Sequence, residues 1–316
     1  MSDNQYLQSL LDKCGCITFP PINPADGGNI YNISEPLVIR SGCDLTLDGC
    51  VLRLCDGVYS NIFISEGAWE KTPAPTENIS IRAVNGAILS GGKHNGLTER
   101  TANRDGRPSV LHNTLLLFRN VHGFRLSGLK IYDPRYWGMT FYYCSDGEIR
   151  DTEFRAANDA PNQDGIDLRR GCHDIIIDGV TGSTGDDTVA LTALMHSLEE
   201  RLEFDGASPD VYNVSISNVS TEVTGGHGIV RLLCHDGIKM HSIRIANIYD
   251  RLIDTKRTKC QAAIRIQDAN YWTLSPARNG DMYDITIDGV TTNAPIAVKL
   301  HGDIPELRLR NIATVE

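Results

Sequence analysis

The sequence predicts an all-β fold, a single-stranded right-handed parallel β-helix (β-solenoid) with a short helix that caps its N-terminal end. Two patterns of short strands recur and alternate along the chain, and no helical periodicity separates them. A repeat of roughly 22 to 30 residues built from short strands is typical of a β-solenoid. Crossovers between parallel strands are almost always right-handed, which sets the expected hand of the coil.

The chain begins with a pattern that predicts the capping helix. Within residues 4–13, the apolar side chains of Tyr6, Leu7, Leu10 and Leu11 fall on one helical face. A β-solenoid exposes apolar side chains and strand edges at the end of its core. We therefore expect this helix to cover the first coil.

The first strand pattern reads apolar, polar, apolar, then two small or polar residues, then apolar. Segments of this kind start at Asp44, Asn78, Gly123, Asp174, Asn213, Ser242, Asp284 and Glu306. If the second apolar residue is the anchor, the equivalent positions are Leu47, Ile81, Leu126, Ile149, Ile177, Ile216, Ile245, Ile287 and Leu309. Alternation of this type predicts half-buried strands, and the Gly, Asn and Asp residues between them predict tight corners.

The second strand pattern alternates with the first and supplies another wall of each coil. Its segments are Trp137–Phe141, Asp164–Leu168, Asp187–Leu191, Gly228–Leu232, Ala262–Ile266 and Pro295–Leu300. A β-sandwich of similar strands is the alternative fold, but the alternation of two series would then be accidental. We expect a single domain over residues 1–316, with about 1–36 as the N-terminal cap and about 37–316 as the coils.

Three polar stretches interrupt the repeats, at residues 91–113, 195–209 and 251–261. Insertions of this kind run over the protein surface and often carry functional residues. We expect them to form the walls of a cleft on one side of the stack.

The composition argues against several classes of partner. A net charge of −10 disfavours nucleic acid, because its phosphates would be repelled. No apolar run reaches about 18 residues, so no membrane partner is expected. No basic and apolar leader starts the sequence, which predicts a cytoplasmic protein, or a secreted or periplasmic one if a leader was removed. The sequence predicts no cofactor and leaves the oligomeric state open.

The nine cysteines are an odd number, and Cys14 and Cys16 lie too close in sequence for a CxxC redox or zinc pair. Buried, reduced thiols are the expected state for most of them. A disulfide between neighbouring coils and a metal site are the alternatives.

Acidic residues precede two strands of the second series in matching register. Asp164 lies two residues before Ile166, and Asp187 lies two residues before Val189, with Asp186 beside it. Adjacent parallel strands lie about 4.8 Å apart, so the three carboxylates are expected on one patch. Like charges that close raise at least one pKa, which keeps one acid protonated while a neighbour stays ionised.

The next two coils add polar groups to this patch. His227 lies two residues before Ile229, which predicts the column of Asp164 and Asp187, and Arg265 follows in the coil after that. The whole set is expected to span the size of a sugar-binding subsite.

Four short motifs in this order carry a resemblance to a known family. They are Asn162-Gln163-Asp164-Gly165, Gly185-Asp186-Asp187, Gly226-His227-Gly228 and Arg265-Ile266-Gln267. Each is weak alone, but the set on successive coils resembles the signatures of glycoside hydrolase family 28, the polygalacturonases and their relatives. The resemblance covers most of the chain. It implies inverting hydrolysis of α-linked uronic-acid (pectic) polysaccharides or oligosaccharides, a reaction of pectin degradation and cell-wall metabolism.

The resemblance also implies a role for each matched residue. Asp186 is the expected general acid, and Asp164 and Asp187 are expected to hold and deprotonate the attacking water. An inverting acid and base need about 6.5–9.5 Å between them to fit that water. The expected substrate-binding residues are Asn162, His227, Arg265 and Gln267, and no metal ion is expected.

Two positions depart from the family pattern. Gln163 stands where Thr is usual, and Gln267 stands where polygalacturonases have Lys. A glutamine offers a dipole rather than a full charge to a galacturonate carboxylate, so homogalacturonan is less expected as the substrate. A less acidic sugar, or a carboxylate bound by Arg231, Lys239 or Lys299, fits the change equally well. The missing leader favours exo action on imported oligosaccharides.

Two other function classes stay open. A polysaccharide lyase or uronate epimerase on this fold would bind Ca²⁺ with its carboxylates and use Arg231 or Arg265 as the base. A non-catalytic carbohydrate-binding β-helix would bind sugar without turnover. Asp167 and Asp178 are interpreted as turn caps or as members of stacked side-chain ladders, and Trp137 as either a sugar-stacking wall or core.

Overall fold

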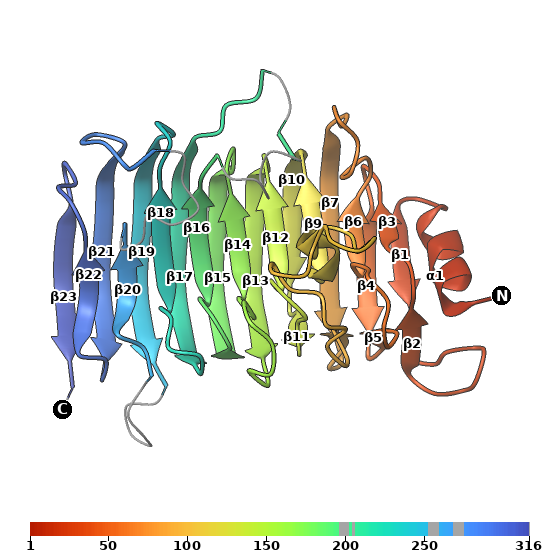
Figure 1. Ribbon diagram of the computed structural model, residues 1–316. Helices are drawn as coiled ribbons and strands as arrows, with labels where there is room; N and C mark the ends of the chain where they lie inside the picture. Colours follow the sequence, from red (N-terminus) through yellow and green to blue (C-terminus); the bar gives the residue numbers. More distant parts are fainter. Residues whose placement is uncertain (196–201, 204–205, 252–258, 268–274, 316) are drawn as a thin grey trace.

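In the computed structural model the chain winds into a parallel β-helix, with the helix α1 at one end of the stack and the strand β23 at the other (Figure 1). The structure describes residues 1–195, 202–203, 206–251, 259–267 and 275–315. Within these residues every hydrogen-bonded pair of neighbouring strands is parallel. The predicted fold class is confirmed.

The helix α1 (Asp3–Leu11) covers the N-terminal end of the core, as predicted. The side chains and backbones of Ser2 and Gln5 cap it reciprocally, with N–H to oxygen distances of 3.2 and 3.0 Å. Leu7 and Leu11 are buried in the main hydrophobic core. Among the described residues, no helix is long and apolar enough to cross a membrane.

The larger of two sheets contains 14 strands in the described part of the chain. They are β1 (Cys16–Phe19), β2 (Ile30–Ile33), β4 (Asp44–Asp48), β5 (Val51–Leu54), β7 (Thr76–Val84), β8 (Ile88–Ser90), β10 (Val121–Ser127), β11 (Lys130–Tyr132), β13 (Ser145–Arg155), β15 (His173–Thr184), β17 (Val211–Val223), β19 (Met240–Asp250), β21 (Met282–Thr292) and β23 (Arg308–Thr314).

The first predicted strand series forms this larger sheet. Its anchors pair in register from Ile81 and Leu126 onward, as expected. The first anchor is the exception, because Leu45, not Leu47, lies opposite Ile81. The two leucines are both buried and two residues apart, so the alternation pattern alone does not distinguish them.

The smaller sheet contains nine strands in the same described part. They are β3 (Leu37–Ile39), β6 (Phe63–Ser65), β9 (Leu116–Arg119), β12 (Met139–Tyr142), β14 (Ile166–Arg169), β16 (Val189–Ala193), β18 (Val230–Cys234), β20 (Ala262–Ile266) and β22 (Ile296–Leu300).

The second predicted series forms this smaller sheet. Ile166, Val189, Val230 and Ile264 stack in register, and each is fully buried. Complete burial of such a side chain contributes about 1.5–3 kcal/mol. This column holds the preceding turns of successive coils at a constant spacing, and the polar residues of interest lie on those turns.

The 91–113 insertion folds over the outer face of β9 and β12. It contains a short 3₁₀ helix, η1 (Val110–Asn113), and Leu97 and Leu111 pack with Tyr136 and Trp137 in a second apolar cluster. It therefore forms a wall beside the smaller sheet, as predicted. Residues 196–201, 204–205 and 252–258 of the other two insertions lie outside the described residues. All nine cysteines are free thiols, and six are buried.

Candidate active site

The carboxylates predicted to share one patch lie on the turns that lead into β14 and β16. Asp164 is opposite Asp187, and the N–H of Gly165 donates to the backbone oxygen of Asp187 at 3.0 Å. A Cβ atom on Gly165 would lie 2.4 Å from the carbonyl oxygen of Thr188, so only glycine permits this approach of the two coils. The predicted column of Asp164 and Asp187 is therefore correct.

His227 lies one position away from its predicted place. Val230, not Ile229, pairs with Val189, so Gly228 is opposite Asp187 and His227 is beside Asp186. The Gly228 N–H donates to Asp187 Oδ1 at 2.8 Å and so anchors this register.

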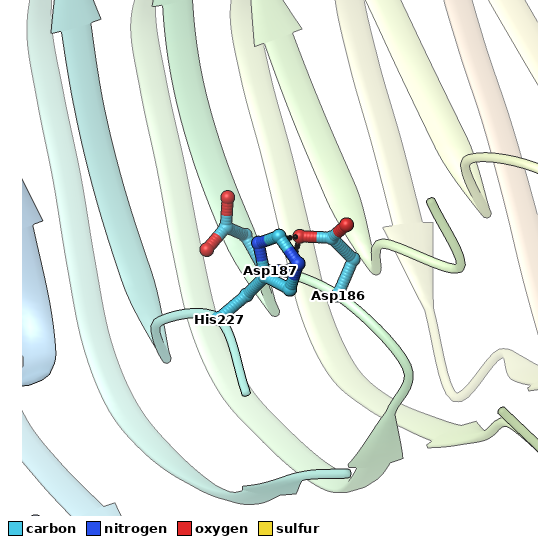
Figure 2. Close-up of side chains that lie close together, drawn as sticks. All are labelled: Asp186, Asp187 and His227. Atoms are coloured by element: carbon cyan, nitrogen blue, oxygen red, sulfur yellow. Dashed lines mark hydrogen bonds and ion pairs between the residues drawn. The ribbon is translucent and has the colours of Figure 1, made fainter. Parts of the chain in front are cut away.

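The shift of one residue brings His227 into direct contact with a carboxylate. Its Nδ1 atom lies 2.8 Å from Asp186 Oδ1. Figure 2 marks this contact with a dashed line. The same oxygen accepts the backbone N–H of Asp187 at 2.9 Å. Among the described residues, no hydrogen bond reaches Asp186 Oδ2, which leaves that oxygen for a ligand.

Buried hydroxyl groups support the turn that carries Asp186. Thr184 donates its hydroxyl to the Asp186 backbone oxygen at 2.7 Å, and Thr188 connects it to Thr221 through contacts of 3.0 Å each. Gln163, on the neighbouring turn, donates to the Pro134 carbonyl at 2.8 Å. Buried hydroxyl groups thus fix the backbone of this turn.

We call the cavity over these residues the carboxylate pocket, and its volume is about 80 Å³. It is lined by Glu99, Trp137, Asn162, Asp164, Asp167, Arg169, Asp186, Asp187, Ala190, Thr192, Leu194, His227, Arg231 and Leu233. All three predicted catalytic aspartates and two predicted substrate-binding residues are in this set.

A second cavity, the amide pocket, adjoins it and has a volume of about 380 Å³. It is lined by Glu99, Asn158, Ala160, Pro161, Asn162, Gly185, Asp186, Gly225 and His227. Glu99, Asn162, Asp186 and His227 line both pockets. Asp186 therefore lies between two spaces that can each receive part of a ligand.

The environment of Asp164 favours its protonated form. Burial raises its pKa well above the usual value, and the nearby carboxylates of Asp186, Asp167 and Asp187 raise it further, while Arg231 opposes them. Its Oδ1 is buried and has no hydrogen-bond partner in the described structure. A buried carboxyl of this kind is common at functional sites.

Asp187 and His227 are shifted in ways that fit their contacts. Burial and then the charge of Asp186 raise the pKa of Asp187, and Arg231, His227 and the Gly228 N–H act against that rise. The hydrogen bond with Asp186 raises the pKa of His227. The cluster therefore retains protons to higher pH than isolated side chains do.

Two arginines in the carboxylate pocket contact its acidic side chains. Arg231 Nη1 lies 3.5 Å from Asp187 Oδ2, and Arg169 Nη1 lies 3.8 Å from Asp167 Oδ1. The Arg169 guanidinium also lies 4.5 Å from the centre of the Trp137 ring. Trp137 is both a pocket wall and part of an apolar cluster, so neither of its two predicted roles is exclusive.

Gln267 does not join the other predicted substrate-binding residues. Its side-chain amide donates to the Cys234 carbonyl at 2.7 Å and accepts the Cys234 N–H at 3.0 Å. The amide thus connects two coils and does not line the carboxylate pocket. Lys239, an alternative carboxylate ligand, is ion-paired with Asp281 at 2.6 Å.

Arg265 lies at the edge of the site. Its Nη1 is 3.5 Å from His227 Nδ1, and it stacks in register between Arg231 and Lys299 on successive strands. Three basic side chains therefore follow the aspartates along the smaller sheet.

Sequence reasoning missed Glu99, Asp167 and Arg169 as site residues. The interpretation of Asp167 as a turn cap is wrong, because it lies within β14, is 1% exposed and lines the carboxylate pocket. The sequence did offer one indication, because Asp167 is at an outward-facing position of the strand that follows Asp164. Nothing in the repeat pattern marks Glu99, since its loop lies outside the coils.

Glu99 reaches the site through the 91–113 insertion. Its carboxylate accepts a hydrogen bond from the Tyr136 hydroxyl. Burial raises its pKa, and the charge of Asp186 adds to that rise, while Tyr136 and Arg169 oppose it. Glu99 is therefore a fourth acidic side chain near Asp186, in addition to Asp164, Asp167 and Asp187.

Asp186, Asp187 and His227 also have the donor atoms of a metal site, since one atom from each lies within 4.8 Å of the other two. Carboxylate and imidazole ligands of this kind bind several divalent cations. The same atoms make the hydrogen bonds described above, so metal binding would compete with them.

A parallel β-helix with a cluster of buried carboxyl groups on the outer face of one sheet fits a glycoside hydrolase of the β-helix type. The sequence profile of the glycosyl hydrolases family 28 matches residues 38–230, more than half of the chain. The chain belongs to this family, and the predicted resemblance is confirmed.

Individual relatives are more distant. A probable polygalacturonase of Arabidopsis thaliana is 26% identical in an alignment of 162 positions that covers 44% of this chain and 35% of that protein. The chain thus spans about a third of the length of this curated relative.

Two solved structures share the fold over nearly the whole chain. An endo-xylogalacturonan hydrolase from Aspergillus tubingensis superposes with a TM-score of 0.60 at 14% identity, covering 98% of this chain and 80% of that one. An exopolygalacturonase from Thermotoga maritima gives 0.59 at 14% identity, covering 97% and 76%. At these identities the similarity shows the fold alone.

Proposed function

We propose that this protein hydrolyses α-linked glycosidic bonds in pectic, uronic-acid-type oligosaccharides or polysaccharides, with inversion at the anomeric carbon. The observation that carries the proposal is the convergence of Asp164, Asp186 and Asp187 in one pocket, where burial and mutual repulsion raise the pKa of Asp164 and Asp187. Hydrolysis of this kind needs one carboxyl that gives a proton and another that takes one.

Asp186 is the proposed general acid. It is the aspartate that lines both pockets, and its Oδ2 is available to a glycosidic oxygen placed between them. His227 shares a hydrogen bond with its Oδ1, and the raised pKa of this histidine helps the pair keep a proton. The pair then delivers that proton to the leaving group through Asp186.

Asp164 and Asp187 are proposed to act on the water. A carboxylate with a raised pKa is a stronger proton acceptor in its ionised form, so Asp164 is suited to take the proton from the attacking water. Asp187 is fixed by the Gly228 N–H and by Arg231 and is suited to orient that water. The two residues face each other across one strand spacing, which lets them hold one water together.

Asn162 and Arg265 are proposed to bind the sugar. Asn162 lines both pockets, where its amide can donate to and accept from hydroxyl groups. Beyond Arg231, which is ion-paired with Asp187, Arg265 and Lys299 place positive charge on the side of the site that leads to the C-terminal coils. That side is suited to a uronate carboxylate.

We also propose exo action on oligosaccharides. The 91–113 insertion stands beside the pocket and places Glu99 and an apolar cluster across its N-terminal side. A wall at this position favours a chain end over an internal segment. Rapid loss of viscosity of a long pectic polymer, before many reducing ends appear, would contradict exo action.

The experiment that tests the proposal measures reducing ends on a panel of pectic oligosaccharides, with wild type and Asp186→Asn side by side. Reducing ends should appear without the ultraviolet absorbance of an unsaturated product, and the variant should release at least about 100-fold fewer. Absorbance that rises with the reducing ends, and that a chelator abolishes, would instead establish a metal-dependent lyase. Binding without turnover in both proteins would establish a carbohydrate-binding β-helix.

A further inference from the structure

Among the described residues that line the amide pocket there is no lysine or arginine. Its charged and titratable side chains are Glu99, Asp186 and His227, and the rest are amides or small residues. Asp186 lines the cavity and is 7% exposed, and no described residue hydrogen-bonds its Oδ2. A ligand here meets the carboxyl groups of Glu99 and Asp186, the imidazole of His227 and amide groups, and Arg265 lies outside the lining, 3.5 Å from His227.

The adjoining carboxylate pocket does not supply the missing cation. Arg169 is 3.8 Å from Asp167 and covers the face of Trp137, and Arg231 is 3.5 Å from Asp187. Each guanidinium is therefore already engaged with a protein carboxylate. A carboxylate brought into this region would be added to five acidic side chains and would face two arginines.

Glu99 is the second acidic side chain that lines the amide pocket. The Tyr136 hydroxyl holds its carboxylate in place, and its charge is close enough to Asp186 for the two to interact. A uronate placed beside the ionised form of Glu99 would oppose a like charge, which is unfavourable in a partly buried space.

We propose that the amide pocket is a subsite for a neutral, hydroxyl-rich sugar unit, and that Glu99 is the residue that excludes a uronate from it. This inference rests on the proposed hydrolysis of pectic chains and deepens it, because the chain would carry a neutral unit at this position. Sugar hydroxyls both donate and accept hydrogen bonds, whereas a carboxylate only accepts.

The remaining lining residues fit such a unit. Asn158 and Asn162 provide amides at the rim, and Glu99 and Asp186 provide acceptors for hydroxyl donors. Small residues form the rest of the surface, and the pocket volume of about 380 Å³ is within the range of sites for small ligands.

The test uses the four α-1,4-linked disaccharides that combine galactose and galacturonate in every order. These compounds differ at C6 of each unit, where a neutral hydroxymethyl replaces a carboxylate. The wild type should cleave best a disaccharide with galactose at one fixed position, and should cleave digalacturonate at least about tenfold less well. Preference for digalacturonate in the wild type would overturn the proposal.

Glu99→Gln keeps the size and hydrogen-bonding capacity of the side chain and removes its charge. In this variant, kcat/KM for digalacturonate should rise about tenfold relative to the best mixed disaccharide. Asp105→Asn is the matched control, since Asp105 is an exposed acid on the same insertion that does not line either pocket. An unchanged ratio in Glu99→Gln would show that Glu99 does not select the sugar.

The same four disaccharides separate this inference from the proposed function. If the wild type cleaves none of them, the proposed hydrolysis of pectic bonds is contradicted. The neutral subsite is then tested by Kd values, measured by calorimetry for wild type and Glu99→Gln. The subsite is supported if the wild type binds a mixed disaccharide more tightly than digalacturonate and if this preference becomes smaller in Glu99→Gln. Equal ratios in both proteins contradict it. If Glu99→Gln does not fold, the preference of the wild type decides the neutral subsite.

Discussion

Asp164 lies on the turn before β14 and Asp178 lies in β15, the next strand in the chain, yet the two environments shift the pKa in opposite directions. Asp178, on the outer face of the larger sheet, accepts hydrogen bonds from Ser217 at 2.7 Å and Asn218 at 2.6 Å and is ion-paired with Arg150. These hydrogen bonds lower the pKa of Asp178. Asp164, at the smaller sheet, is buried among carboxylates, and its pKa is raised.

The comparison separates two uses of aspartate on a repeating coil. On the larger sheet, Asp178 and Asp284 tie neighbouring strands together through hydrogen bonds and ion pairs, as the ladder interpretation of Asp178 predicted. On the smaller sheet, Asp164 is held without such partners, at a cost in stability that a structural residue would not carry. The predictions below test this difference.

The largest expected effect is on turnover. Asp164→Asn and Asp187→Asn should each lower kcat by about 10²–10⁴-fold, because each removes a group proposed to act on the attacking water. Asp178→Asn should stay within about twofold of wild type, since it lies on the other sheet. Rates are measured on the best disaccharide of the panel, with thermal unfolding as a check of folding. A similar loss in Asp178→Asn would remove the distinction.

The pH profile of His227→Gln should show a smaller effect. Its hydrogen bond with Asp186 raises the pKa of His227, so the pair in the wild type keeps its proton as the pH rises. Without the imidazole, the alkaline limb of kcat/KM should move to lower pH, with about a tenfold loss of kcat at neutral pH. His301→Gln is the control, because His301 is exposed and lines neither pocket. An alkaline limb that stays in place would show that His227 does not hold the proton.

Stability should respond in opposite directions at Asp164 and Asp178. The pKa of Asp164 is raised in the folded protein, so this carboxyl opposes folding once the pH exceeds its pKa in the unfolded chain, about 3.9. Asp164→Asn removes this effect and should raise Tm at pH 7 by about 2–5 °C. The gain should disappear in acid, where the wild-type carboxyl is protonated in both states.

The lowered pKa of Asp178 gives the reverse sign. Its stabilisation is present above the unfolded pKa and is lost as the pH falls through the folded value, so Asp178→Asn should lower Tm at pH 7 and converge with wild type in acid. Thermal scans of both variants at neutral and acid pH measure the two signs. Equal signs at pH 7 would contradict the comparison.

The smallest expected effect on activity is at Gln267. Gln267→Asn keeps a residue that tolerates the observed φ of 54° but shortens the amide that bonds both backbone groups of Cys234. The free energy of unfolding should fall by about 1–2 kcal/mol, while kcat/KM stays within about twofold. Denaturant titration and kinetics measure both quantities. A loss of more than about tenfold in kcat/KM at unchanged stability would restore Gln267 as a substrate-binding residue.

The repeat pattern was sufficient to predict the coil and most of the site. Alternating apolar residues predict buried columns of stacked side chains. Because Ile166 pairs with Val189, the residues two positions earlier, Asp164 and Asp187, are also opposite each other. Where two apolar residues compete for one position, as Ile229 and Val230 do, the pattern is ambiguous by one residue. The backbone hydrogen bond from Gly228 to Asp187 decides the register, and it is not visible in the sequence.

The remaining site residues depend on contacts that the repeat does not encode. Glu99 reaches Asp186 through an insertion whose path is set by packing of Leu97 and Leu111 on the outer face of the sheet. Gln267 is predicted as a substrate ligand because its motif matches by position, and in the structure its side-chain amide bonds the backbone of Cys234. Side-chain direction at a strand end depends on such local partners.

The most direct test of the central claim is the anomeric configuration of the first product. Proton NMR of the reaction with the best disaccharide should show the β anomer of the released sugar first, with the α anomer growing by mutarotation, and no signal in Asp186→Asn. That result is expected when Asp164 and Asp187 direct water to the face opposite Asp186. Initial release of the α anomer, or of an unsaturated sugar, would contradict the assignment of the three aspartates as an inverting hydrolytic set.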